Sequence, residues 1–269
     1  MQELRLAVFF LLLLFVGCSP PSLTFGILSD IHGNATNAAY FVEVFHQRGV
    51  DAILVPGDLV DHFRNTIPDE RELEEVLSVL RQAEVPMYVI PGNHEQQSIY
   101  YSIVKKNPFL IDMSRQRYAD LGDIRILSLP GYNRPEYIAE GGFLVSDFSD
   151  LSRFVSPHKK NILLAHQLPR GALIDVVFSG EHVGDAGLVN ILKQNNIDIL
   201  VGGHIHESGG VAETRDGTFI SQNTYAETLY LNAGSVAPWW HLNGTAYKGM
   251  AALLTVNKNG AMYEVIDIP

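Results

Sequence analysis

Short clusters of acidic, histidine and asparagine residues follow apolar segments at five places along this chain. The apolar segments, residues 23–28, 52–55, 87–90, 162–165 and 199–201, are typical of buried β-strands. A sheet would deliver clusters that follow its strands to one edge. We therefore expect the following groups to meet in space: Ser29-Asp30-Ile31-His32, Gly57-Asp58-Leu59-Val60-Asp61, Gly92-Asn93-His94-Glu95, Ala165-His166 and Gly203-His204-Ile205-His206.

The spacing inside two of these clusters has a direct geometric interpretation. Asp30 and His32 are two residues apart, as are His204 and His206. Side chains two residues apart leave an extended strand on the same face. Each pair is therefore expected to point its side chains to one side of a strand end, where they can bind metal ions. Together the clusters supply carboxylates, imidazoles and one amide in the number that two divalent ions and a bridging water require.

The order of the clusters resembles that of the calcineurin-like metallophosphoesterases. Their pattern is D-x-H, G-D-x-x-D, G-N-H-[DE], a lone His and G-H-x-H, and every part is present here in order, between about residues 24 and 237. Segments 166–169, 180–184 and 203–207 are also similar to the small prokaryotic branch of this superfamily. The resemblance implies an α/β fold, a four-layer αββα sandwich of two mixed β-sheets flanked by helices, with the metal site at the strand ends. It names no substrate.

The same resemblance implies how the ligands are divided between two ions. Asp58 would bridge the pair through its carboxylate. The first ion would be held by Asp30, His32, Asp58 and His206, and the second by Asp58, Asn93, His166 and His204. Oxygen and imidazole ligands without thiolate suit manganese, iron, zinc, cobalt or nickel, so we expect two divalent transition metal ions without naming the element.

These ligands imply hydrolysis without a covalent intermediate. Two divalent ions lower the pKa of a bridging water, so that hydroxide can attack phosphorus directly, opposite the leaving oxygen. His94 follows the ligand Asn93 and is expected at the rim of the site, where it can protonate the leaving alkoxide. By resemblance, Asp61 holds the far nitrogen of His94 and orients its ring. His94 and Asp61 are therefore the predicted catalytic residues.

Each of these residues also has an ordinary structural explanation. Asp30 and Asn34 could cap the helix that follows, because their side chains accept hydrogen bonds from free backbone N–H groups. The glycines could be turn residues, and a lone histidine such as His166 is more often structural than a ligand. Seven ligand-type residues in family order at the ends of apolar runs nevertheless favour the metal site.

Residues outside the motifs are weaker candidates. Asn34 is a candidate for substrate contact beside the first cluster, and His182 lies on a glycine-flanked loop between two ligand clusters. Loops on a rigid scaffold often contact substrate, although a role for His182 without substrate contact is the favoured alternative. Trp239 and Trp240 could line a pocket for an aromatic base or could belong to the core.

The remaining pattern predicts alternating strands and helices. Helices are expected at residues 38–46, 69–83 and 185–194, and the second of these has an apolar face and acidic residues in its first turn. Further strands are expected at 124–129, 161–164 and 198–201. After residue 217 only strands are expected, at 218–221, 228–231, 249–256 and 261–266. Parallel units followed by a meander predict two packed sheets with helices outside.

Composition limits the class of protein. The chain has 269 residues, of which 46% are hydrophobic and 18% charged, and no linker or repeat divides it, so one metallophosphoesterase domain is expected over residues 19–269. The formal net charge is −11. Binding to nucleic acid needs a basic face, so a nucleic-acid partner is not expected. A small phosphorylated substrate is compatible with this charge, because two metal ions can reverse the local sign.

The first eighteen residues are interpreted as a signal peptide. Residues 7–16 form an apolar run that is too short to span a bilayer. Gly17 and Cys18 follow, and Cys18 is the only cysteine of the chain. This arrangement resembles a bacterial lipobox, although Phe15 stands where that motif usually has Leu. We expect an exported lipoprotein, attached to the membrane through Cys18 on the periplasmic or extracellular side. A plain cleaved signal and an uncleaved anchor are the alternatives.

Three functions fit these observations. The favoured one is hydrolysis of a small, nucleotide-like phosphomonoester or phosphodiester. The second is a nuclease acting on DNA or RNA, which the acidic charge disfavours. The third is a non-catalytic, lipid-anchored binding protein on the same fold, which the loss of a ligand residue would have supported. The sequence retains every ligand, and it makes no prediction of the oligomeric state.

Overall fold

The structure is a computed structural model that describes residues 22–64, 67–145 and 149–269. The predicted signal peptide and Cys18 lie outside these residues, so their prediction stays open. Within the described ranges, no helix is both long and apolar enough to cross a membrane.

The first sheet has six strands in the order β15-β14-β1-β2-β3-β4. Strands β1 to β4 are parallel to one another, and β14 pairs antiparallel with both β1 and β15. The carboxyl ends of four neighbouring strands therefore lie at one edge of this sheet. Its strands are β1 (Leu23–Ile27), β2 (Ala52–Val55), β3 (Met87–Val89), β4 (Leu110–Asp112), β14 (Met250–Asn257) and β15 (Gly260–Asp267).

The second sheet has seven strands in the order β10-β9-β11-β8-β7-β6-β5. Its centre, β6, β7, β8 and β11, is parallel, and antiparallel strands close both sides. The strands are β5 (Tyr118–Leu121), β6 (Ile124–Leu129), β7 (Lys160–Ala165), β8 (Ile199–Gly202), β9 (Val211–Glu213), β10 (Phe219–Ile220) and β11 (Leu229–Asn232). A separate hairpin is formed by β12 (Trp239–Trp240) and β13 (Ala246–Tyr247).

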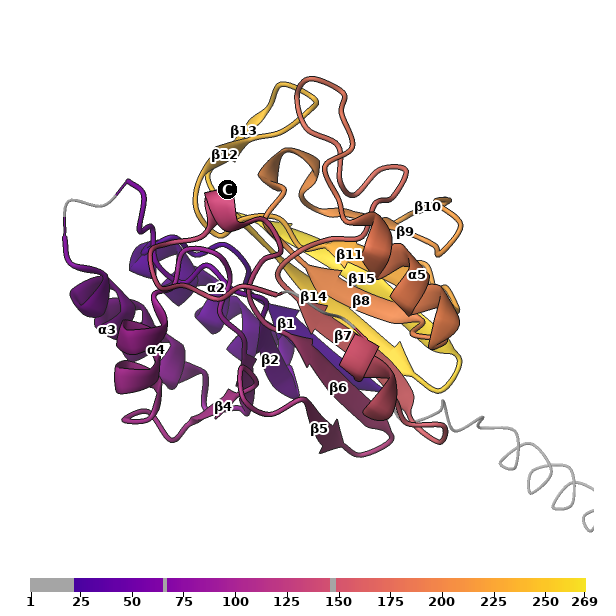
Figure 1. Cartoon of the computed structure of the whole chain (residues 1–269), viewed down its shortest axis with the longest axis horizontal. Helices are drawn as coiled ribbons and strands as arrows, with labels where there is room; N and C mark the ends of the chain where they lie inside the picture. Colours follow the sequence, from indigo (N-terminus) through magenta and orange to yellow (C-terminus); the bar gives the residue numbers. More distant parts are fainter. Residues whose placement is uncertain (1–21, 65–66, 146–148) are drawn as a thin grey trace, which may run out of the picture.

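Helices cover the outer faces of the two sheets, with α2, α3 and α4 beside the first and α5 beside the second (Figure 1). Helix α2 shows how the sequence sets its limits. The Asn34 side chain accepts a hydrogen bond from the Asn37 backbone N–H at 3.0 Å, and Gly49 ends the helix in a left-handed conformation. The helices are α2 (Ala35–Arg48), α3 (Asp69–Leu80), α4 (Gln97–Val104) and α5 (Ala186–Gln194), with 3₁₀ turns η1 (Arg81–Ala83), η2 (Pro135–Tyr137), η3 (Ser149–Arg153) and η4 (His206–Ser208).

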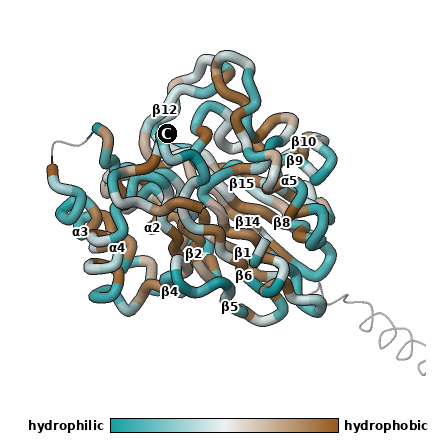
Figure 2. The backbone as a smooth tube through the Cα atoms, in the orientation of Figure 1, coloured by the Kyte–Doolittle hydropathy of each residue, from teal (hydrophilic) through white to brown (hydrophobic). Residues whose placement is uncertain are grey.

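Three apolar cores separate four layers. One lies between the helices α2 to α4 and the first sheet, a second between the two sheets, and a third between the second sheet and α5. Strands at the centre of the molecule are mainly hydrophobic, whereas hydrophilic residues gather in the peripheral loops and helices (Figure 2). The predicted αββα arrangement of two mixed sheets is confirmed.

Most predicted elements are present, with differences at their ends. The helix predicted at 69–83 is α3 followed by the separate turn η1. The strands predicted at 249–256 and 261–266 are β14 and β15. Helix α4 and the strands β4, β5, β9, β12 and β13 were not predicted. Helix α4 begins after Gln96, which makes no side-chain capping hydrogen bond, so its start carries no sequence signal.

Gly26 on β1 is a place where helix α2 approaches the first sheet closely. Its neighbours Phe25 and Ile27 face the core between the sheets, so strand alternation turns Gly26 toward α2. A Cβ atom at this position would lie 2.4 Å from the Phe45 ring. Only glycine therefore allows Phe45 of α2 to pack this close to the strand.

We predict that Gly26→Ala lowers the free energy of unfolding by about 2 kcal/mol, the cost of overpacking a filled core. Urea unfolding followed by circular dichroism measures this loss. The double variant Gly26→Ala/Phe45→Leu should lose less than the sum of the two single variants, because the shorter side chain makes room for the methyl group. Additive losses would show that the two residues do not compete for the same space.

Candidate metal centre

Asp58 lies at the centre of the predicted cluster, directly after β2. Its Oδ1 accepts hydrogen bonds from the backbone N–H groups of Asn93 (2.8 Å) and His94 (3.0 Å). Its Oδ2 points the other way and lies within 4.0 Å of a nitrogen in each of three imidazoles, those of His32, His94 and His166. One carboxylate oxygen is thus anchored to the loop after β3, and the other faces histidines from both sheets.

A first group forms around Asp30, after β1. The His206 Nε2 atom lies 3.1 Å from Asp30 Oδ1 and 3.4 Å from His32 Nε2. The Ser29 hydroxyl and the His204 backbone N–H donate hydrogen bonds to the Asp30 carboxylate. Asp30 is fully buried, so these contacts replace its lost hydration.

A second group forms around His166, after β7. Its Nε2 lies 2.8 Å from Asn93 Oδ1 and 3.2 Å from His204 Nδ1. Its Nδ1 lies 3.0 Å from the Pro56 carbonyl oxygen, which can only accept, so Nδ1 donates to it and Nε2 is the nitrogen directed at the cluster. Asn93 is oriented in the same way, because its Nδ2 donates to the Tyr137 carbonyl and leaves Oδ1 facing inward.

These contacts bring together all seven predicted ligands. Three overlapping sets, Asp30/His32/His206, His32/Asp58/His94 and Asp58/His166/His204, each place three ligand atoms within 4.8 Å of one another. The first and third sets divide the residues as the resemblance implied. Their role as ligands remains a prediction.

The backbone that carries these side chains differs from the extended geometry expected from the spacing. Asp30, His32 and His204 have φ angles of 52°, 46° and 68°, and Asp58 has 53°. His206 begins the turn η4 rather than continuing a strand. The same-face argument was therefore wrong, because the paired side chains converge from left-handed turns beyond the strand ends. Such conformations cost about 1–3 kcal/mol each and cluster at functional sites.

The sequence model described as calcineurin-like phosphoesterase matches residues 23–208, which contain all of these positions. The chain belongs to this family. Its members' metal-dependent phosphoester chemistry accounts for the acid and histidine cluster at the sheet edges. The sequence matches none of the curated proteins with which it was compared.

Solved structures of the same fold are distant in sequence. A dimetal phosphatase from Danio rerio aligns with a TM-score of 0.63 and 13% identity, over 93% of this chain and 100% of that one. GAP50, the anchor in the inner membrane complex of Plasmodium, aligns with a TM-score of 0.59 and 15% identity, over 91% and 84%. A putative 5′-nucleotidase from Staphylococcus aureus aligns with a TM-score of 0.57 and 13% identity, over 93% of this chain and 54% of that one. At these identities the similarity shows the fold alone.

The carboxylates of this calcineurin-like phosphoesterase stay ionised despite their burial. Burial alone would raise the pKa of Asp30, but the charge and hydrogen bond of His206 outweigh it and hold this pKa well below its usual value. For Asp58 the burial effect is likewise outweighed, here by His166 and His94, and its pKa is also strongly lowered. Burial lowers the pKa of His32 and His204 to about 3, which leaves both rings neutral ligand donors.

The cluster fits divalent metal ions. Among the described residues, every ion pair of Asp30 and Asp58 is with a histidine rather than with a lysine or arginine. Burial would lower the pKa of His166, but the Asp58 charge raises it to about 9, so a proton on this ring offsets part of the negative charge. Metal binding requires that proton to leave. Two buried carboxylates with imidazole and amide neighbours are a donor set that transition metals prefer.

His94 and Asp61 lie at the rim, as the sequence predicted, but at a longer distance. His94 Nε2 faces Asp58 Oδ2 at 3.7 Å, and His94 Nδ1 faces Asp61 Oδ1 at 3.6 Å. The ring therefore has the expected orientation, whereas 3.6 Å is too long for the hydrogen bond implied by the resemblance. His94 keeps 14% of its side chain exposed, so a substrate can reach it.

The two candidate substrate residues differ in position. Asn34 caps α2, as its structural alternative proposed, and also borders the cavity that contains His32 and His94. His182 Nδ1 pairs with the buried carboxylate of Asp175 at 2.8 Å. That contact explains the orientation of His182 without a substrate, and its substrate role stays a prediction.

Glu95 is a functional-site residue whose role the sequence analysis left unassigned. Its carboxylate is buried and accepts hydrogen bonds from the backbone N–H groups of Leu59 (2.5 Å) and Gly92 (2.6 Å). It therefore ties the loop after β2 to the loop after β3. Burial and the neighbouring Asp58 raise the pKa of Glu95 to about 8. Its place in the Gly-Asn-His-Glu motif was the only signal for this role.

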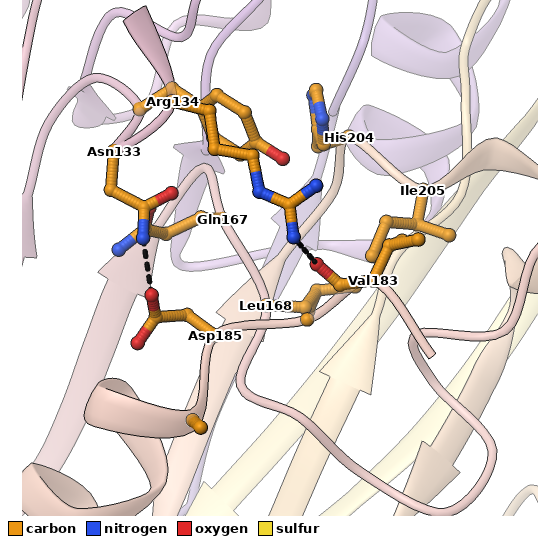
Figure 3. Close-up of a pocket in the computed structure, with 11 residues that line it drawn as sticks. Asn133, Arg134, Gln167, Leu168, Val183, Asp185, His204 and Ile205 are labelled. Atoms are coloured by element: carbon orange, nitrogen blue, oxygen red, sulfur yellow. Dashed lines mark hydrogen bonds between the residues drawn. The ribbon is translucent and has the colours of Figure 1, made fainter. Parts of the chain in front are cut away.

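A small cavity of about 140 Å³ adjoins the cluster on the His204 side, between β8 and the loop around Tyr132 (Figure 3). The Tyr132 ring packs on the His204 ring with centroids 4.1 Å apart. Arg134 donates a hydrogen bond to the Val183 carbonyl across this cavity. Gln167 borders it too, and neither amide atom of this buried side chain has a partner among the described residues.

We predict that Gln167→Met raises the free energy of unfolding of the metal-free protein by about 1 kcal/mol. An unpaired buried amide costs about 1–3 kcal/mol, and methionine keeps a similar shape without polar atoms. Chemical denaturation of both proteins in the presence of a chelator measures the difference. A loss of stability in the variant would show that the amide is satisfied in the folded protein.

Proposed function

We propose that this protein is a dinuclear metal-dependent hydrolase of small phosphomonoesters or phosphodiesters. The observation that carries the proposal is the position of Asp58, whose Oδ2 faces histidines of both ligand groups while Oδ1 is held by two backbone N–H groups. A carboxylate in this position can be shared by two ions. When bound, two divalent ions supply a water of lowered pKa and neutralise charge on the phosphoryl oxygens.

The protein's own residues would then perform three tasks. Asp30, His32 and His206 would hold one ion, and Asn93, His166 and His204 would hold the other. The Nδ1–H of His166, fixed on the Pro56 carbonyl, keeps the opposite nitrogen available for binding. His94 at the exposed rim donates a proton to the leaving oxygen, and Asp61 opposite its far nitrogen stabilises the protonated ring.

We predict that Asp58→Asn lowers kcat by at least ~100-fold and removes bound metal, because a shared carboxylate neutralises both ions, and outer-sphere changes alone cost about 10–100-fold. Asp30→Asn should be milder, since its carboxylate belongs to one ligand group. Metal analysis and hydrolysis of p-nitrophenyl esters after reconstitution measure both effects.

Asp175→Asn is the matched control for these variants. Asp175 is also a fully buried aspartate paired with a histidine, but it lies outside the three ligand sets. It should keep its metal content. Two ions still bound to Asp58→Asn, with near-normal turnover, would disprove the shared-ligand arrangement.

We predict that His94→Ala slows esters of basic alkoxide leaving groups far more than p-nitrophenyl esters, whose stable leaving group needs little proton donation. Metal content should stay close to that of the wild type. Comparing kcat for alkyl and p-nitrophenyl phosphates, with metal analysis of the same samples, tests this. Asp61→Asn should show the same selectivity in weaker form, because it leaves the acid in place. Equal losses for both leaving groups, or loss of metal, would remove His94 as the general acid.

A further inference from the structure

An aromatic groove leads away from the metal centre on the His94 side. A cavity of about 480 Å³, lined by His32, His94 and His206, shares Arg64, Pro238 and Trp239 with a second cavity of about 490 Å³. The two cavities therefore adjoin each other along these three residues, and together they are called the groove. The first cavity contains the proposed general acid, His94, and the second is also lined by Phe178 and Trp240.

Large aromatic side chains stand exposed along this groove. Phe63, Phe178 and Trp240 have 54%, 56% and 60% of their surface accessible, and they come from three separate segments of the chain. The Phe63 ring packs edge-on against His94 with centroids 4.7 Å apart, and the Trp239 ring packs edge-on against His206 at 4.5 Å. Such concentrations of exposed apolar surface mark binding sites.

Polar groups beside the groove distinguish a heteroaromatic ligand from a purely aliphatic one. The Trp239 Nε1–H is buried and finds no acceptor within the described parts of the chain. The Arg64 guanidinium lies 5.1 Å above the Trp239 ring and is itself exposed. An acyl chain offers no acceptor to the exposed Arg64 guanidinium, whereas a heteroaromatic ring offers acceptors to it and a flat face to the neighbouring rings.

We infer that this groove binds the nucleobase of a nucleoside phosphate, stacked between Phe178 and the Trp239–Trp240 strand, with the ester bond at the metal centre. The inference rests on the proposed function, which places the phosphoester at the metal centre. The leaving alcohol is then a nucleoside. Stacking on aromatic side chains tolerates different bases, so the groove recognises a base as a class.

Both tryptophans of the chain line this groove, so intrinsic fluorescence reports on it without any need for catalysis. Metal-free full-length protein is titrated with adenosine, uridine, ribose and octanol. We expect adenosine and uridine to quench the fluorescence saturably and ribose to leave it unchanged. Phe178→Ala should weaken adenosine binding about five-fold or more, the loss expected for one stacking partner.

Phe219→Ala is the matched control, because Phe219 is 55% exposed, close to the 56% of Phe178, but borders neither cavity of the groove. It should bind adenosine like the wild type. The inference is overturned if neither nucleoside quenches, if ribose quenches equally, if octanol binds more tightly than adenosine, or if Phe219→Ala weakens binding as much as Phe178→Ala.

Kinetics of the metal-loaded protein separate this inference from the proposed function. The ratio of kcat/KM for a nucleoside monophosphate to that for ribose 5-phosphate should exceed unity and fall in Phe178→Ala and Trp240→Ala. Hydrolysis of p-nitrophenyl phosphate with no preference for the nucleotide would overturn the base subsite and leave the proposed function standing. Saturable quenching by adenosine without hydrolysis of any ester would support the subsite and overturn the proposed function.

Discussion

The arrangement of the candidate metal centre depends on the different contacts of the two carboxylate oxygens of Asp58. One is held by backbone N–H groups after β3, and the other is directed at imidazoles that arrive from both sheets. Because the first contact fixes the carboxylate plane, the second oxygen cannot turn away from the charges around it. The two sheets are thereby joined at their carboxyl edge by polar contacts, in addition to the apolar core that lies between them.

The left-handed conformations around this carboxylate are imposed by contacts distant in sequence. The Asp30 backbone N–H donates to the Gly57 carbonyl at 3.2 Å, and that of His32 donates to the Asp58 carbonyl at 3.0 Å. The turn after β1 therefore takes its shape from the turn after β2. Strain of this kind persists only where surrounding structure over-determines it. The four layers supply that support, and the ligand positions are preorganised at some expense of stability.

These contacts also explain what could be predicted from the sequence. The convergence of the clusters was predictable, because apolar runs and strand polarity are local signals that place Asp30, Asp58 and His166 at one edge. The left-handed turns were not, because their cause lies in hydrogen bonds between segments. The role of Glu95 could not be assigned for the same reason, since its partners Leu59 and Gly92 follow different strands. The groove around Trp239 likewise exists only where three distant loops meet.

The direction of β1 has a consequence for how the molecule would face a surface. Leu23 begins the strand, and the turn containing Asp30 follows its other end. Leu23 follows Cys18 by five positions, and five extended residues reach about 18 Å at most. With a lipid on Cys18, the amino edge of the first sheet would rest near the bilayer and the opposite edge would look outward. Such an enzyme would sample solutes from the surrounding medium rather than the headgroups beneath it.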